Sequence, residues 1–447
     1  MFNKYCIGFI FASAALISGC DDTDSKPSFE VKVVSSDQTQ VSGGNARIAG
    51  TLPDGVEIND LVVILNHEEV QPELTLNADG SEFTGVIDGL NLGDNTLEVT
   101  ATTQEDEFES SSLVLTNYPL SGPVFSGPQQ QPFYCYQDEL TDVGLGQADE
   151  NCMTPKVVSF LYLTTEGSWS EYTPGMERPE NMATTVTTDG NEVDFIVRWE
   201  RGTLNRFIYS ITMLSSASQS LETPDLNSWN KKLLFYFQGG VGVGHKQGEF
   251  SSRRALFTEG LKRGYAVAYS TGTATTTHYN LQVSGETALM LKEQFIKEYA
   301  VPKYSVAVGQ SGGAVQQYMF AQNHKGLLDA LIPALSYPDM VTQTTAAADC
   351  SLIERWIDFE IMADADSKWT DWTKRTLLEG FNASNDISSE LFEYGLTHPH
   401  LPNGASECSQ TWNGLVPLVF NPYWGTVDGV SAEDQVNTEW THFADAI

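Results

Sequence analysis

The stretch that decides the fold is YSVAVGQSGGAVQQY, residues 304–318. Residues 304–308 are typical of a buried strand, and a helix is expected over 314–322. Between them, residues 309–313 fit G-x-S-x-G, the pattern of a sharp strand-to-helix turn that exposes a serine hydroxyl at the edge of a sheet. Such a turn needs glycines because neighbouring backbones come too close for a Cβ atom. The pattern alone is common in loops, but its position between a strand and a helix predicts that Ser311 is a nucleophile.

A second glycine-rich segment, residues 238–244, follows the apolar strand expected at 233–237. A loop at that position offers a backbone N–H to a developing oxyanion, and the residue after the nucleophile offers another. We therefore expect an oxyanion site built from Gly240, Val241 and Gly312. Phosphate binding is a competing interpretation, but the run has neither G-x-G-x-x-G spacing nor the ending of a P-loop. A flexible loop without function is the other alternative.

Strands and helices alternate around these two motifs. Besides the elements named above, strands are expected at 265–269 and 328–335, and helices at 253–262 and 286–299. Apolar strands that alternate with amphipathic helices predict a parallel sheet covered on both faces, so the fold class is α/β. Hairpin strands at 193–197 and 207–211 precede it. Residues 351 to about 400 are expected to form a helical insertion, a lid or cap, whose tryptophans at 356, 369 and 372 are more typical of a core than of a binding surface.

The chain divides into several parts by composition. Residues 28–116 show short alternating strands separated by turn clusters, which predicts a small all-β, immunoglobulin-like sandwich without evident chemistry. Residues 117–132 are rich in Pro, Gly and Gln and are expected to be a linker. The α/β domain then occupies residues 133–447.

The N-terminus has the pattern of a bacterial lipoprotein signal. Lys4 is followed by an apolar run too short to span a bilayer, and residues 16–20 read LISGC. Residues 1–20 are therefore expected to be the signal, Cys20 the lipidated residue and residues 21–27 a tether. These features predict a protein held in the cell envelope by its N-terminal lipid alone, on the periplasmic side or the outer surface.

Charge excludes some partners. The sequence has 59 Asp and Glu against 24 Lys and Arg, a formal net charge of −35, which repels nucleic acid and anionic lipid headgroups. A strongly solvated surface is the simplest interpretation of this charge. No nucleic-acid partner and no cofactor are expected, and the partner is an ester or polymer substrate.

Four cysteines would remain in the exported protein: Cys135, Cys152, Cys350 and Cys408. In an oxidising compartment four cysteines suggest two disulfides, with three possible pairings. Proximity in sequence favours Cys135–Cys152 and Cys350–Cys408. None of them forms a Cys-x-x-Cys pair, so no metal site is expected.

The segment 233–339 resembles the α/β-hydrolase core. Three motifs carry a narrower resemblance, to a domain-of-unknown-function family of exported hydrolase-like proteins distantly similar to tannases and feruloyl esterases: FQGGVG (237–242), GQSGGAVQQY (309–318) and PALSYPD (333–339). The resemblance covers most of the chain after Pro119 and implies ester hydrolysis without fixing a substrate. The sequence departs from true tannases at Gln310, where those enzymes have a cysteine before the nucleophile.

The catalytic acid and base are expected after the serine, in the order Ser, Asp or Glu, His. Asp339 is the candidate acid, and His442 or His400 the candidate base. A competing expectation, favoured because members of the resembled family are longer, is that both lie beyond Ile447. In that case this chain by itself would have little or no esterase activity.

Three functions follow from these patterns. The first is hydrolysis of carboxylic esters through an acyl-enzyme on Ser311. The second is a hydrolase-like surface protein without catalysis that binds a polymer or glycan. The third is a serine peptidase, which requires the same turn around the nucleophile.

Overall fold

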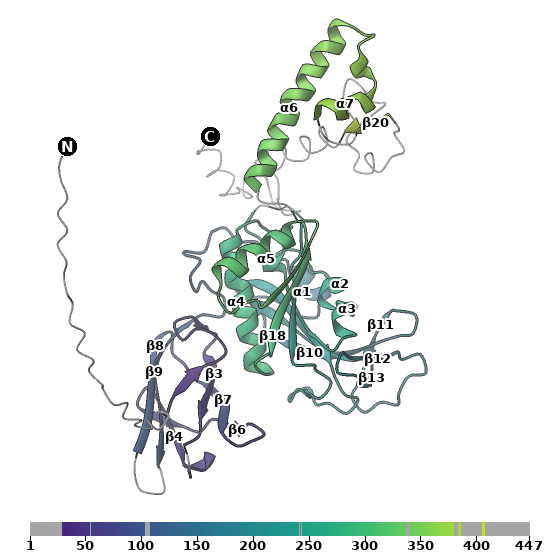
Figure 1. Cartoon of the computed structure of the whole chain (residues 1–447). Coiled ribbons are helices and arrows are strands. Elements are labelled where there is room, and N and C mark those ends of the chain that lie inside the picture. Colours follow the sequence, from purple (N-terminus) through teal and green to yellow (C-terminus); the bar gives the residue numbers. More distant parts are fainter. Residues whose placement is uncertain are drawn as a thin grey trace, which may run out of the picture.

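The computed structural model describes residues 29–53, 55–102, 108–240, 242, 244–336, 340–379, 383–385 and 405–406. The chain has the predicted mixed α/β fold. Figure 1 shows an N-terminal pair of sheets, a large sheet with helices on both faces, and a helical segment that extends away from it. No helix in the described part of the chain is long and apolar enough to cross a membrane.

The N-terminal part consists of two sheets around one core. The four-stranded sheet has the order β1 (Val31–Val33), β3 (Asn45–Thr51), β7 (Glu82–Asp88), β6 (Leu74–Leu76). The five-stranded sheet has the order β2 (Val41–Ser42), β9 (Phe108–Tyr118), β8 (Gly93–Thr102), β4 (Leu61–Leu65), β5 (Glu68–Val70), and the short helix η1 (Ile58–Asp60) precedes β4. Alternate side chains of both sheets, such as Ile48 and Leu97, are fully buried in a shared cluster. The last strand ends at Tyr118, slightly beyond the predicted boundary at 116, because Asn117 still pairs with Gly93.

The large sheet has eight strands. Their order is β11 (Trp169–Tyr172), β10 (Val157–Leu163), β14 (Ile196–Leu204), β15 (Phe207–Leu214), β17 (Ala266–Ser270), β16 (Lys232–Tyr236), β18 (Tyr304–Gln310), β19 (Ala330–Ala334). The pairs β17–β16, β16–β18 and β18–β19 are parallel, as predicted. The other four pairs are antiparallel. The predicted hairpin strands precede the parallel strands along the chain and extend the same sheet, because β15 pairs with β17.

Helices cover both faces of this sheet (Figure 1). The helices α4 (Leu281–Glu298) and α5 (Gly312–Asn323) pack on one face, and α2 (Ser252–Ala255) and α3 (Thr258–Leu261) on the other. The helix predicted over 253–262 is two short helices, because the chain turns at Leu256 and Phe257 to pack both side chains into the core. The helix α4 begins earlier than predicted, because the Asn280 side chain caps it at its N-terminus. The remaining elements before α4 are α1 (Gln137–Asp142), β12 (Thr184–Val186), β13 (Glu192–Asp194) and η2 (Thr271–Thr273).

The predicted helical insertion begins earlier, with α6 (Met340–Ala363), which extends away from the sheet (Figure 1). It is followed by η3 (Lys368–Thr370), α7 (Trp372–Glu379) and the short pair β20 (Ala383–Ser384) and β21 (Ala405–Ser406). Trp369 and Trp372 are buried, as expected of core residues. Trp356 is 45% exposed and meets Trp369 edge to face. The insertion therefore has a small aromatic core of its own.

Buried polar contacts hold the N-terminal sheets against α4. The carboxylate of Glu293 accepts hydrogen bonds from the Ser42 backbone N–H at 3.0 Å and from its hydroxyl at 2.5 Å. The ammonium of Lys297 donates to the Ser42 carbonyl at 2.8 Å and lies 3.5 Å from Glu293. The Arg47 guanidinium donates to the carbonyls of Ile296 and Lys297, both at 2.8 Å. These bonds fix the C-terminal half of α4 to β2 and β3.

The predicted linker is fixed as well. The buried carboxylate of Glu286, on α4, accepts the backbone N–H groups of Val124, Phe125 and Ser126 at 2.9, 2.6 and 2.7 Å, and the Ser126 hydroxyl at 2.9 Å. A carboxylate that accepts four donors is a strong anchor. Residues 124–126 are therefore part of the folded domain.

One of the two expected disulfides is present. Cys135 and Cys152 are bonded, with their Cα atoms 5.3 Å apart. The pairing of Cys350 with Cys408 stays a prediction, because Cys408 and the side chain of Cys350 lie outside the described residues.

Candidate active site

The predicted turn around the serine is present. The strand β18 ends at Gln310, Ser311 follows, and α5 begins at Gly312. Ser311 has φ 55° and ψ −123°, a backbone conformation that residues other than glycine rarely adopt. Its N–H donates to the Ala334 carbonyl at 3.1 Å, and its carbonyl accepts from Ala314 and Val315. The neighbouring strand and the first turn of the helix thus hold Ser311 in this strained conformation.

Glycines make room for the turn. A Cβ atom on Gly309 or on Gly313 would lie 2.3 Å from the Phe237 carbonyl oxygen. A Cβ atom on Gly239 would lie 2.2 Å from the Gln310 carbonyl oxygen and 3.2 Å from the Ser311 Cβ. All three glycines therefore meet backbone atoms that cannot move aside. The same distances place the glycine-rich loop after β16 directly against Ser311.

Two of the three expected oxyanion residues come together. A Cβ atom on Gly312 would lie 3.0 Å from the Gly240 carbonyl oxygen and 2.1 Å from the Thr275 hydroxyl. Gly312 is the first residue of α5, where backbone N–H groups have no partner within the helix. Gly240 has φ 112°, which only glycine adopts without strain. Val241 lies outside the described residues, so its role stays a prediction.

Three residues that hold the glycine-rich loop, Thr275, Tyr269 and Thr276, were not predicted from the sequence. The Thr275 hydroxyl donates to the Gly240 carbonyl at 2.6 Å. Gln238 accepts the Tyr269 hydroxyl at 2.8 Å and donates to the Thr276 hydroxyl at 2.9 Å. The only available signal was the threonine-rich run TGTATTT (271–277) after a strand. Threonines in such a run supply hydroxyl donors to nearby carbonyls.

The expected acid and base fall outside the described residues, because Asp339, His400 and His442 are not described. His324 is at the C-terminal end of α5, and partial burial lowers its pKa below the ordinary value. No group of His, Cys, Asp or Glu among the described residues could hold a metal ion.

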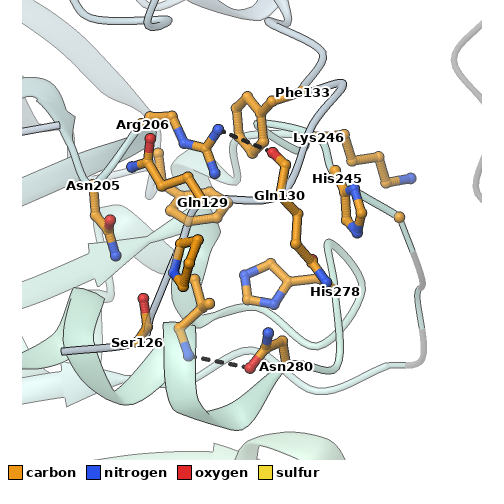
Figure 2. Close-up of a pocket in the computed structure, with 14 residues that line it drawn as sticks. Ser126, Gln129, Gln130, Phe133, Asn205, Arg206, His245, Lys246, His278 and Asn280 are labelled. Carbon is orange, nitrogen blue, oxygen red and sulfur yellow. Dashed lines mark hydrogen bonds between the residues drawn. The ribbon is translucent and has the colours of Figure 1, made fainter. Parts of the chain in front are cut away.

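A cavity of about 100 Å³ lies beside the glycine-rich loop. Figure 2 shows its polar lining, with Arg206 and Phe133 on one side and His245 and Lys246 on another. The lining residues come from the linker, the turn after β14, the end of the glycine-rich loop and the start of α4: Ser126, Pro128, Gln129, Gln130, Phe133, Asn205, Arg206, Phe207, Gly244, His245, Lys246, His278, Asn280 and Val283. Arg206 was not predicted from the sequence as a site residue.

The model of one protein family matches most of the chain. Residues 31–428 match the "Tannase-like family of unknown function (DUF6351)". No curated protein matches the sequence.

Several solved structures are similar to the chain, at low sequence identity and low TM-score. Tannin acyl hydrolase from Aspergillus niger is 12% identical with a TM-score of 0.29, and the match covers 64% of this chain and 55% of that one. An esterase from Aspergillus oryzae is 14% identical with a TM-score of 0.27, over 69% and 61% of the two chains. Oligopeptidase B from Trypanosoma brucei is 12% identical with a TM-score of 0.22, over 68% and 36%. The chain thus spans about half the length of the tannin acyl hydrolase.

Proposed function

Since the chain belongs to the tannase-like family of unknown function, we propose that it is a serine hydrolase that cleaves carboxylic esters through an acyl-enzyme on Ser311. The observation that carries the proposal is the strained backbone of Ser311 between β18 and α5, enclosed by Gly239, Gly309 and Gly313. Strain of this kind persists at sites where function requires it. The fold in this proposal is an α/β-hydrolase sheet, supported by the parallel strands β17, β16, β18 and β19.

The proposed reaction has two steps. The Ser311 oxygen attacks the ester carbonyl carbon while a base takes the hydroxyl proton, and the alcohol then leaves with that proton. Water next attacks the acyl-enzyme, which releases the acid and restores the serine hydroxyl. In both steps the negative oxygen faces N–H groups of the Gly240 region and of Gly312. Asp339 remains the proposed acid, and His442 or His400 the proposed base.

The N-terminal part has a separate proposed role. We propose that residues 1–20 direct export and that a lipid on Cys20 anchors the protein in the envelope, with the immunoglobulin-like sandwich as a spacer. The Cys135–Cys152 disulfide supports an oxidising compartment. Labelling cells with a clickable fatty acid tests the anchor. We expect incorporation to be lost in Cys20→Ala, and unchanged incorporation would contradict the proposal.

A fluorophosphonate probe tests the nucleophile, because such probes react with activated serines. We expect the wild-type protein to be labelled and the Ser311→Ala variant to be unlabelled. Ser336→Ala is the matched control, since Ser336 is exposed just after β19 and should leave labelling unchanged. Equal labelling of Ser311→Ala and wild type would refute the assignment.

A further inference from the structure

The cavity beside the glycine-rich loop contains a buried cation without an anionic partner. Arg206 is 7% exposed, and its Nε has no hydrogen bond. Its guanidinium stacks on the Phe133 ring at 3.9 Å and makes one long hydrogen bond, 3.5 Å, to the Gln130 carbonyl. Arg206 forms no ion pair with any described residue. Burial lowers the pKa of Arg206 to about 10, so it is still charged at neutral pH.

Arg206 occupies a position where its backbone is strained. Asn205 and Arg206 form the two-residue turn between β14 and β15, and both have positive φ, 47° and 69°. A turn of this type favours Asn-Gly, so an arginine at the second position is strained. At this turn the backbone is therefore strained and the Arg206 charge is buried, and the guanidinium lies at the cavity.

A second cation lines the same cavity. Lys246 is half-buried, which lowers its pKa, and no described carboxylate forms an ion pair with it. Glu286 acts electrostatically on Arg206 but already accepts four hydrogen bonds from the linker, and Glu249 acts on Lys246 from an exposed position. In a chain of net charge −35, two cations without ion pairs in one cavity are unexpected unless they face an anion.

The glycine-rich loop connects the cavity with the surroundings of the proposed nucleophile. Gly244 lines it and follows Gly240 by four residues, so their Cα atoms are at most about 14 Å apart. On the other side, His278 and Asn280 line it and follow Thr275, which holds the Gly240 carbonyl. Two segments that line the cavity thus continue directly into the residues that surround Ser311.

From these contacts we propose that the cavity binds a carboxylate through Arg206 and Lys246, and that the preferred substrates are esters that also carry a free carboxylate. The planar guanidinium matches a carboxylate with two parallel hydrogen bonds, and Lys246 adds a point charge at the rim. The substrate class rests on the proposed function, whereas the binding of a carboxylate does not.

Binding is tested first, on the Ser311→Ala protein, by calorimetric titration with succinate and with uncharged succinamide. We expect succinate to bind and succinamide to bind at least about tenfold more weakly. In Arg206→Gly the turn becomes Asn-Gly, which favours folding, and succinate affinity should fall about tenfold or more because a desolvated charge partner is lost. Lys246→Met should weaken it by a smaller factor. Equal binding of the two compounds, or succinate binding unchanged in both variants, would overturn the proposal.

Arg201→Met is the matched control. Arg201 is also buried, with its pKa lowered to about 10, but it donates to the Val143 carbonyl at 3.0 Å and to the Ser159 hydroxyl at 2.8 Å, and it does not line the cavity. Succinate affinity should be unchanged in this variant. If Arg201→Met lowered succinate affinity as much as Arg206→Gly, the loss would be a general effect of removing a buried arginine. That result would overturn the proposed carboxylate site.

Turnover separates the two proposals. We expect the wild-type protein to hydrolyse mono-p-nitrophenyl succinate with a kcat/KM at least about tenfold above that of p-nitrophenyl butyrate, and Arg206→Gly to abolish that preference. Hydrolysis of both esters without a preference would overturn the substrate class alone. Succinate binding that depends on Arg206, with no ester hydrolysed, would support the anion site while contradicting the proposed function.

Discussion

At the strand-to-helix turn over residues 309–313, here called the elbow, Gly239, Gly309 and Gly313 let three backbone segments meet where no side chain fits. Along α4, by contrast, Glu286, Glu293 and Lys297 are buried as charged groups that hold the linker and the N-terminal sheets. The elbow requires residues without side chains, whereas the contact along α4 requires charged side chains. Steric contacts of this kind respond to added volume, whereas buried charges respond to the loss of a partner and to pH.

Added volume should damage the elbow most. In Gly309→Ala the new Cβ would lie 2.3 Å from the Phe237 carbonyl, so the strand and the turn must separate. We expect about 3 kcal/mol of destabilisation from overpacking. The rate of fluorophosphonate labelling should fall about a hundredfold, because a shift of about 1 Å in a reacting group has that effect. Thermal unfolding and labelling kinetics measure the two losses.

Gly260→Ala is the control for this prediction. Its Cβ would meet only side-chain carbons, of Val267 at 3.2 Å and Leu234 at 3.3 Å, within the helix α3. Labelling should stay near the wild-type rate. Equal damage from both variants would mean that the elbow has no special demand for glycine.

Removal of a charge partner should have the next largest effect. Lys297→Met leaves the Glu293 carboxylate buried beside Ser42 without its counter-ion, which should cost about 3 kcal/mol. The double variant Glu293→Gln/Lys297→Met should recover part of this loss, since neither charge then remains. Urea unfolding of the single and double variants gives the coupling between the two residues. Additive losses in the double variant would contradict a paired interaction.

The anchor of the linker should be weaker than the ion pair. Glu286→Gln keeps one acceptor oxygen but turns an amide N–H₂ toward the donors of residues 124–126. We expect a loss of about 2 kcal/mol, as for hydrogen bonds to a charged group. Faster proteolysis between residues 117 and 132 should accompany it. The exposed Glu259, changed to Gln on α3, should leave both stability and cleavage unchanged.

The smallest expected effect is a dependence on pH. Glu200 is fully buried, and burial raises its pKa above the ordinary value of 4.5, although Tyr209 and Tyr299 donate to it at 2.9 and 3.0 Å. The folded state then binds the proton more tightly than the unfolded chain, so this group makes stability fall as pH rises from about 4.5 through the raised pKa. The glycine contacts of the elbow contain no titratable group and contribute no such slope.

Melting temperatures measured from pH 4 to pH 8 test this sign. The wild-type protein should lose more stability toward high pH than Glu200→Gln, which has no proton to lose at this position. A steeper loss in the variant would show that the carboxyl group is held charged, with its pKa lowered.

The sequence by itself determined the parallel part of the large sheet and the place of Ser311 within it. The strand over 304–308, the G-x-S-x-G turn and the helix after it are contiguous, so local sterics and periodicity decide them. The glycine-rich loop was placed for the same reason, because it directly follows the apolar strand β16. The Cys135–Cys152 disulfide was also predicted correctly, from proximity along the chain.

Only the tertiary structure decided which distant side chains meet. Ser42 and Glu293 are 251 residues apart in sequence, and no local pattern marks either as buried. Thr275 reaches the Gly240 carbonyl only because β17 lies beside β16. Arg206 was missed because a lone charged residue in a hairpin turn is normally solvated, and it is buried here only because the linker folds over it. Contacts of this kind depend on the summed packing of segments far apart in the chain, which neither periodicity nor a short motif encodes.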